Sequence, residues 1–365
     1  ARSGNLNTPD LLLIDCDPAR LLVSSRQMGT QIMSLIDWDE PEYLELPDLN
    51  MAVFQAGTPR NDRPSVVLCH GFPEIAYSWR LIVPPLVDAG FHVIVPDQRG
   101  YGYTGLAKSD DRDAVSVSLY DMQHLCDDLA AMLDALDIEQ AVFTGHDWGG
   151  IVTWSLPFYH PSRLAGLIGV NTPFIPRLTL DPIEAFRLAM GDDFYIVAFQ
   201  EHGRAEAVFD ADTARALRCF YRGPDPEETK AVPELGPGWE NFAILKILDS
   251  DEADWPGQPI LHPADFDHYH RAFTRSGFRG GINWYRNFTR NWETSADFEQ
   301  KVDVPCLMVC AENDPFLPPS MAENMPKYVA DLETHLIRDC GHWTQNEKPQ
   351  ELSRLMSDWL GRRFG

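Results

Sequence analysis

The sequence is short of basic residues. Among 365 residues there are 30 Lys and Arg against 55 Asp and Glu, a formal net charge of −25, and the isoelectric point is near 4.7. So acidic a surface repels the phosphates of nucleic acids and of anionic lipids. We therefore expect no nucleic-acid partner and no binding to anionic membranes.

Long hydrophobic runs are also absent. No stretch of eighteen apolar residues occurs, whereas a membrane-spanning helix needs about 20. The N-terminus lacks the charged and then apolar pattern of a secretory signal peptide. We therefore expect no membrane span and a cytoplasmic location.

Cysteines and histidines show no metal-binding spacing. The seven cysteines are scattered and odd in number, which is typical of reduced thiols in a cytoplasmic protein. No zinc-type cysteine spacing and no H-E-x-x-H pattern occurs, so we expect no metal ion and no organic cofactor. The cysteines are Cys16, Cys69, Cys126, Cys219, Cys306, Cys310 and Cys340.

Short apolar runs alternate with helix-like segments along most of the chain. The alternating pattern of residues 43–54, around a polar turn, predicts a β-hairpin. Continuous apolar runs are typical of strands buried on both faces of a parallel sheet. The order favours a doubly wound, mainly parallel α/β sheet. The predicted strands are residues 65–69, 91–96, 141–144, 164–170, 306–310 and 335–337, and the predicted helices are 79–89, 119–136, 149–158 and 350–360.

The alternation of strand-like and helix-like segments stops between residues 173 and 297. The region is rich in helix formers, Pro and Gly, and it has no strand-like run. It therefore predicts a helical cap inserted between two core strands. The predicted divisions are an N-terminal extension over residues 1–41, a core over 42–172 and 298–365, and the cap over 173–297.

A strand, a sharp turn and a helix meet at residues 145–150, which read GHDWGG. This is the G-x-nucleophile-x-G pattern, with Asp147 in the place of the nucleophile. Small residues around it let a strained turn pass close to its neighbours. The N–H groups of the following helix favour an ionised carboxylate, so Asp147 is expected to be an anion at neutral pH. Taken alone, the segment also fits an ordinary helix with Asp as its N-cap.

Two further candidates follow later strands. Asp314 comes after one predicted strand and His342 comes just after the next. The chain order nucleophile, acid, histidine is that of α/β-hydrolases, in which the acid orients and stabilises the imidazolium. Each residue alone also fits a turn Asp or a packed His, so the combination carries the prediction.

An oxyanion site is predicted beside them. Residues 70–74, which read HGFPE, end a strand in a turn fixed by Gly and Pro. The backbone N–H groups of Phe72 and Trp148 can then converge on an oxyanion.

Together these motifs resemble the soluble epoxide hydrolase family. The resemblance covers residues 42–360 and implies the α/β-hydrolase fold with an inserted helical cap. It also implies that water is added to a small hydrophobic epoxide to give a diol, without a cofactor, by a monomer or homodimer. The segments that carry it are residues 70–74, 99–102, 145–150 and 341–345, with 195–201 and 278–287 in the cap.

The resemblance assigns roles in the cap as well. Tyr195 and Tyr285 stand where the family has two tyrosines that point at the nucleophile and bind the epoxide oxygen. Opening an epoxide generates an alkoxide, which two phenols can protonate or stabilise. The implied intermediate is an alkyl ester of the nucleophile. Glu74 and His146 lie beside the expected site and are candidates for positioning water.

The sequence departs from the family in places. His202 stands where the family commonly has Pro, and the Pro-, Gly- and acid-rich stretch between Tyr221 and His270 does not align, so the shape of the substrate stays open. Vertebrate members carry a phosphatase domain before the hydrolase. Residues 1–40 are too few to form one, and no phosphatase activity is expected.

Two other functions are weighed against this one. A haloalkane dehalogenase uses the same Asp, acid and His, but it needs a second halide-binding donor, often an Asn where this chain has Phe72. A non-catalytic binding protein on the same fold would need no nucleophile, acid and base in register. Both are less favoured than epoxide hydrolysis.

Overall fold

The computed structural model describes residues 36–104, 116–223 and 242–365. Most of the predicted N-terminal extension, with Cys16, lies outside the described residues. The other six cysteines are buried free thiols. Within the described ranges no helix is both long and apolar enough to cross a bilayer.

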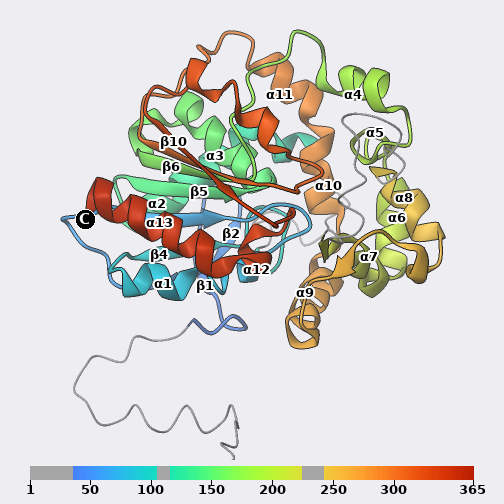
Figure 1. The fold of residues 1–365 in the computed structure, drawn as a ribbon, viewed down its shortest axis with the longest axis horizontal. Coiled ribbons are helices and arrows are strands. Elements are labelled where there is room, and N and C mark those ends of the chain that lie inside the picture. The colour runs from blue at the N-terminus through green and yellow to red at the C-terminus, as the bar shows by residue number, and fades with distance from the viewer. Residues whose placement is uncertain (1–35, 105–115, 224–241) are drawn as a thin grey trace, which may run out of the picture. The chain divides into compact units, whose positions relative to one another are not determined.

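An eight-stranded sheet lies at the centre of the described chain (Figure 1). The strand order is β1-β2-β4-β3-β5-β6-β9-β10, and the neighbouring pairs from β4 onward are parallel. The hairpin of β1 and β2 joins this sheet by antiparallel pairing with β4. The predicted hairpin and mainly parallel sheet are thus confirmed. The strands are β1 (Glu42–Glu45), β2 (Asn50–Ala56), β3 (Ser65–Cys69), β4 (Val93–Pro96), β5 (Ala141–His146), β6 (Leu164–Val170), β9 (Cys306–Ala311) and β10 (Leu332–Ile337).

Helices cover both faces of the sheet. One core lies against α2 (Met122–Ala135) and α3 (Trp148–Tyr159), and the other against α1 (Val83–Asp88) and α13 (Pro349–Phe364). Successive side chains of a strand point to opposite faces. Val67 and Phe143 therefore belong to the first core, while Val66 and Val142 belong to the second. Burial on both sides explains why these strands are continuous apolar runs.

The predicted helix over residues 79–89 begins too early. The chain first forms a 3₁₀ turn, η2 (Ala76–Trp79), and α1 begins only at Val83. Pro84 and Pro85 lie in the first turn of α1, where a missing N–H costs no hydrogen bond. The other short 3₁₀ helices are η3 (Val117–Tyr120), η4 (Pro161–Arg163), η7 (Glu252–Asp254), η8 (Pro319–Ala322) and η9 (Met325–Lys327).

Between β6 and β9 the chain forms a series of helices, called here the inserted helices. They lie together beside the sheet in Figure 1. Besides the helices, this region holds one short strand pair that the sequence did not predict, in which β7 (Arg222–Gly223) pairs antiparallel with β8 (Gln258–Pro259). Two residues are too few to show an alternating pattern. The helices are α4 (Pro182–Met190), α5 (Tyr195–Ala198), α6 (Arg204–Ala211), α7 (Thr213–Phe220), α8 (Ile244–Asp249), α9 (Pro263–Ser276), α10 (Arg279–Arg286) and α11 (Phe288–Thr294), and the short α12 (Thr344–Glu347) comes later, after β10.

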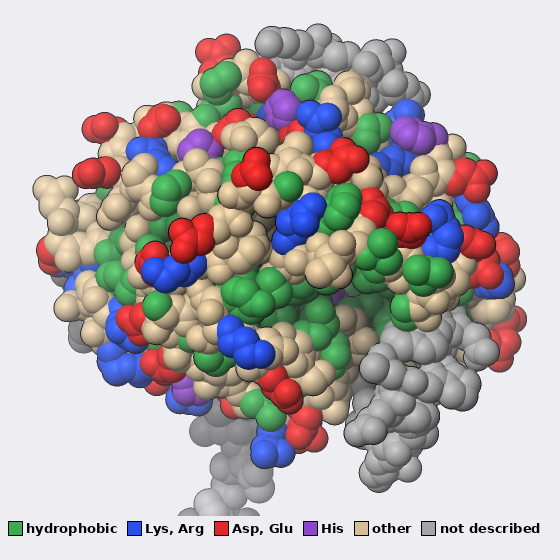
Figure 2. All heavy atoms as spheres, turned by 90° about the horizontal axis from the view of Figure 1, so that it is seen from above, with side chains coloured by type: hydrophobic (Ala, Val, Ile, Leu, Met, Phe, Trp, Pro, Cys, Tyr) green, Lys and Arg blue, Asp and Glu red, His purple; other side chains and the backbone are tan. Residues whose placement is uncertain are grey.

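Figure 2 shows one face of the molecule, turned from the view of Figure 1. Acidic and basic side chains are interspersed across this face, and hydrophobic side chains gather around a hollow in it.

Candidate active site

Asp147 lies on a sharp turn between β5 and α3. Its φ of 51° and ψ of −123° fall outside the regions that residues other than glycine ordinarily occupy. The turn also brings α3 close to β3, since a Cβ atom on Gly149 would lie 2.5 Å from the carbonyl oxygen of His70. Glycine at that position is therefore a steric requirement of the turn.

Asp147 stands at the N-cap position of α3, but its carboxylate makes no N-cap hydrogen bond. The alternative interpretation as an ordinary N-cap is therefore wrong. Its Oδ1 atom accepts a hydrogen bond from the N–H of Phe72 at 2.7 Å, and the N–H of Trp148 also donates to it. The two N–H groups predicted to form an oxyanion site thus converge on one carboxylate.

Two opposing effects act on the charge of this carboxylate. Burial raises the pKa of Asp147 above its usual value, because the anion loses its hydration. The histidines His342 and His146, together with the two N–H donors, act against burial and favour the anion. The sequence predicted only the second effect.

His342 lies between two carboxylates. Its Nδ1 atom is 2.9 Å from Oδ2 of Asp314, and its Nε2 atom is 3.7 Å from Oδ2 of Asp147. Asp314 follows β9 and His342 follows β10, and the carboxyl ends of parallel strands meet at one edge of the sheet. The structure therefore brings the predicted nucleophile, acid and histidine together.

The carboxylates determine the charge of the imidazole. Burial acts to lower the pKa of His342, but the negative charges of Asp314 and Asp147 outweigh it and raise that pKa to about 9. Burial likewise acts to raise the pKa of Asp314, but His342 and other donors lower it to about 2. At neutral pH the site thus holds an imidazolium beside the ionised Asp314.

Two tyrosines of the inserted helices reach the same place. Tyr195 begins α5 and Tyr285 lies in α10, with ring centroids 5.7 Å apart. Burial raises the pKa of both phenols, and the charge of Asp147 contributes in the same direction. Both phenols therefore stay protonated and able to donate at neutral pH.

The position of Tyr285 depends on a contact between two glycines. Gly280 of α10 lies against Gly100, and a Cβ atom on Gly280 would be 2.6 Å from Cα of Gly100 and 2.8 Å from its carbonyl carbon. The indole N–H of Trp284 adds a hydrogen bond to the carbonyl of Arg99 at 3.1 Å. Two segments that the sequence analysis singled out, 99–102 and 278–287, thus fix α10 against the core.

Glu74 and His146 are buried beneath the site. Glu74 Oε1 lies 2.6 Å from Nδ1 of His146 and accepts the N–H of Gly71 at 3.0 Å, while Oε2 accepts from Gln345 at 2.6 Å. Burial acts to raise the pKa of Glu74, but His146 lowers it to about 2. His146 Nε2 lies 2.7 Å from the carbonyl oxygen of His342. Both side chains thus hold loops of the site, and their positioning of water stays a prediction.

Asn171 belongs to the site, and the sequence analysis missed it. It directly follows β6, and its Nδ2 atom donates to Oδ2 of Asp314 at 2.7 Å. No motif marks it. The only signal is its position, a polar residue at the carboxyl end of a predicted parallel strand.

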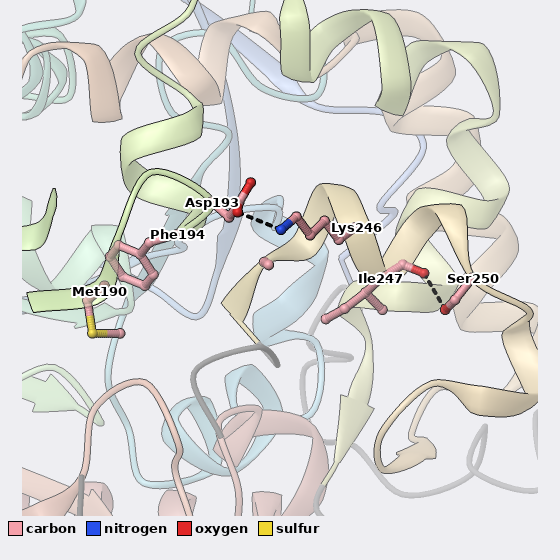
Figure 3. A pocket seen from close by; sticks show the side chains of 7 residues that line it. Met190, Asp193, Phe194, Lys246, Ile247 and Ser250 are labelled. Atoms are coloured by element: carbon pink, nitrogen blue, oxygen red, sulfur yellow. Dashed lines mark hydrogen bonds and ion pairs between the residues drawn. The ribbon is translucent and has the colours of Figure 1, made fainter. Parts of the chain in front are cut away.

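A separate recess of about 390 Å³ lies among the inserted helices (Figure 3). Lys246 and Asp193 point toward each other across it and pair at 2.5 Å. None of the predicted site residues lines this recess, so we assign no chemistry to it. Among the described side chains, no group of three or more His, Cys, Asp and Glu is arranged to hold a metal ion. The recess is lined by Met190, Asp193, Phe194, Ala243, Lys246, Ile247 and Ser250.

Comparison with known proteins identifies the family. Residues 64–349 match the model of the alpha/beta hydrolase fold. The chain is 39% identical over 317 residues to epoxide hydrolase A of Mycobacterium tuberculosis (strain ATCC 25618 / H37Rv), which covers 86% of this chain and 94% of that protein. It is 38% identical over 304 residues to bifunctional epoxide hydrolase 2 of Sus scrofa, covering 81% of this chain and 51% of that protein.

Solved structures agree with these relatives. The crystal structure of epoxide hydrolase A from Mycobacterium thermoresistibile matches with a TM-score of 0.75 and 37% sequence identity, over 88% of this chain and 98% of that one. The fold class and the family resemblance predicted from the sequence are therefore confirmed. This chain belongs to the α/β-hydrolase fold family and, within it, to the epoxide hydrolases.

Proposed function

We propose that this protein adds water to a small hydrophobic epoxide and releases a vicinal diol, with Asp147 as its nucleophile. The observation that carries the proposal is the pairing of a carboxylate on a strained turn with two protonated phenols from the inserted helices. A nucleophile alone leaves the alkoxide of the opened epoxide without a proton, and the phenols supply one. The names of the relatives support the same reaction.

In the first half of the reaction an ester forms on Asp147. Its Oδ1 atom is held by the N–H of Phe72, which leaves Oδ2 to attack an epoxide carbon. The carbon–oxygen bond of the epoxide breaks, and its electron pair goes to the epoxide oxygen. Tyr195 or Tyr285 donates a proton to that oxygen.

In the second half water hydrolyses the ester. His342, oriented by Asp314, takes a proton from water, and the hydroxide adds to the ester carbonyl. The N–H groups of Phe72 and Trp148 stabilise the oxyanion, a donor role whose loss typically costs about 10²–10³ in rate. Collapse breaks the bond between the carbonyl carbon of Asp147 and the ester oxygen, and that oxygen takes the proton from His342 as the diol leaves. The carboxylic acid left on Asp147 returns its proton to the phenolate, which restores the carboxylate and the phenol.

The groups around the nucleophile are assigned roles as well. The inserted helices, within residues 173–297, act as the cap, and the rings of Phe72, Trp148 and Tyr285 lie in contact, which suits an apolar substrate. Glu74 and His146 keep the attacking water in place through the loops that they hold. The enzyme works in the cytoplasm as a monomer or homodimer, and it needs no cofactor.

A dehalogenase with the same triad fits less well. Phe72 offers no side-chain donor for a halide, so Trp148 would have to bind it alone. No second halide donor is therefore apparent among these residues.

The test is a paired assay on terminal, aromatic and aliphatic epoxides and on haloalkanes, which measures diol and halide release. We expect diol from at least one epoxide, its loss in Asp147→Ala, and its retention in the surface control Asp358→Ala. Halide release without diol would move the assignment to a dehalogenase. Release of neither diol nor halide from any compound of the panel would contradict the proposed activity.

A further inference from the structure

Asn171 connects the acid, the histidine loop and the nucleophile turn. It is buried, with 1% of its surface exposed, and its φ of 60° is a left-handed conformation that Asn tolerates better than most residues. Its backbone N–H donates to the carbonyl of Val309 at 2.8 Å. The end of β6 is thereby tied to β9, the strand that leads to Asp314.

The side chain of Asn171 reaches both partners of the acid–histidine pair. Its Nδ2 atom donates to Oδ2 of Asp314 at 2.7 Å, and it lies 3.2 Å from the carbonyl oxygens of Gly341 and His342. Its Oδ1 atom accepts the hydroxyl of Thr344 at 2.7 Å. One amide therefore holds the carboxylate of the acid and the backbone on which the histidine stands.

The carboxylate of Asp314 has a full set of donors. Oδ1 accepts the N–H groups of Phe316 and Leu317 at 2.8 and 3.0 Å. Oδ2 accepts from Asn171 and lies 2.9 Å from Nδ1 of His342. Without the amide, the imidazole would be the only partner of Oδ2. The carboxylate could then rotate about the bonds that hold Oδ1, and Nε2 of His342 would no longer be directed at Asp147.

The next residue continues the connection to the nucleophile. The hydroxyl of Thr172 donates to the carbonyl oxygen of Asp147 at 2.9 Å, and its side chain fills the space beside Gly150. Two consecutive residues after β6 therefore link the nucleophile turn to the acid and the histidine.

We propose that Asn171 is a positioning residue for the second half of the reaction. It holds the carboxylate of Asp314 and the His342 loop in the arrangement in which the imidazole takes a proton from water. The proposal rests on the proposed function, because it names a role within ester hydrolysis. Attack by Asp147 on the epoxide does not use the imidazole as a base, so the first half does not depend on Asn171.

The kinetics separate this role from a loss of folded protein. If only ester hydrolysis slows, kcat and KM fall together and kcat/KM stays constant, because the ester accumulates. We expect Asn171→Gly to lower kcat and KM by the same factor, roughly 10- to 100-fold, the range known for residues that hydrogen-bond to metal-ligating histidines. Glycine is chosen because it adopts a positive φ without strain. The matched control is Asp137→Gly, an exposed residue with a φ of 56°, for which both constants should stay unchanged.

A second variant covers the case in which Asn171→Gly fails to fold. Thr344→Val keeps the shape of residue 344 but removes the hydroxyl that fixes the amide, and it should lower kcat and KM together by a smaller factor. Rapid quenching with mass spectrometry should show the ester on Asp147 accumulating in both variants. A fall of kcat at constant KM, or of kcat/KM without accumulated ester, would overturn the proposal. A wild-type enzyme that makes no diol would instead refute the proposed function.

Discussion

His342 Nε2 lies 3.7 Å from Oδ2 of Asp147, beyond the length of a hydrogen bond but close enough for each charge to act on the other. The charge of Asp147 is one reason why the pKa of His342 is raised. Ester formation removes that charge. The first half of the reaction should therefore lower the pKa of His342 and favour the neutral imidazole that the second half needs.

This relationship predicts two different pKa values for one imidazole. In the free enzyme His342 should titrate near 9. Ester hydrolysis needs the neutral imidazole, so its rate should rise with pH through a pKa that is lower, because the ester carries no charge. Single-turnover hydrolysis rates across pH give the second value, and NMR titration against His342→Gln gives the first. Equal values would contradict the coupling.

The same raised pKa has a consequence for stability. The pKa of His342 rises from 6.5 to about 9 on folding, so the protonated imidazole stabilises the fold. This contribution is complete below the unfolded value and is lost as pH rises through the folded value. In chemical denaturation, the stability gap between wild type and His342→Gln should narrow from neutral to alkaline pH. A stability difference that widens as the pH rises would contradict the raised pKa of His342.

The two cap phenols should act only in the first half of the reaction. Replacing either Tyr195 or Tyr285 by Phe should lower the rate of ester formation by about 10², the lower end for loss of a general acid, because the other phenol remains. The double variant should lose far more. Stopped-flow measurements of ester formation and decay check this, with Tyr43→Phe, 51% exposed, as the control. An equal fall in the rate of ester decay would contradict the assignment of the two phenols to ester formation.

The contact between Gly280 and Gly100 should be needed for activity. A methyl group on Gly280 meets backbone rather than a side chain that can move aside, so Gly280→Ala should push α10 and Tyr285 away from Asp147. A displacement of about 1 Å can cost about 10² in rate, and kcat/KM should fall accordingly. The control is Gly361→Ala in α13, where the added Cβ meets nothing within 4 Å. Equal activity of the two variants would show that α10 tolerates displacement.

A buried ion pair should support the segment that carries Gly100. Arg99 donates twice to Asp128, and their side chains are 1% and 8% exposed. Asp128→Asn removes the charge that holds the guanidinium at this contact, and breaking a buried pair costs about 3–5 kcal/mol.

The matched comparison is Asp358→Asn. Asp358 pairs with Arg354, and the two side chains are 57% and 61% exposed, so this substitution should change the free energy of unfolding by less than about 1 kcal/mol. Denaturant midpoints of both variants measure the difference. Similar midpoints would mean that the buried pair contributes no more than a surface pair.

The strands could be predicted well because burial on both faces leaves a clear record in the sequence. Residues 164–170 form β6 with the predicted bounds, since an apolar run is bounded there by turn residues. The start of α1 was missed because Pro84 and Pro85 weaken a helix in its interior but not in its first turn. β7 and β8 have two residues each and leave no periodic pattern.

The sequence predicts those site residues whose side chains are chemically reactive and occur in a known order along the chain. Asp147, Asp314 and His342 each follow a strand of one parallel sheet, so their chain order implies their proximity. Asn171 follows a strand as well, but an amide has no chemistry of its own that a motif could reveal. The distance of its Nδ2 atom from Asp314 had to be seen in the fold.

In the proposed reaction Asp147, and not water, attacks the epoxide. The most direct test is a single turnover, with enzyme in excess, in water labelled with the heavy oxygen isotope. We expect an unlabelled first diol, because its new oxygen comes from Asp147, and label in the peptide that contains Asp147. Label in the first diol, with none in that peptide, would show that water attacks the epoxide directly and that Asp147 is not the nucleophile.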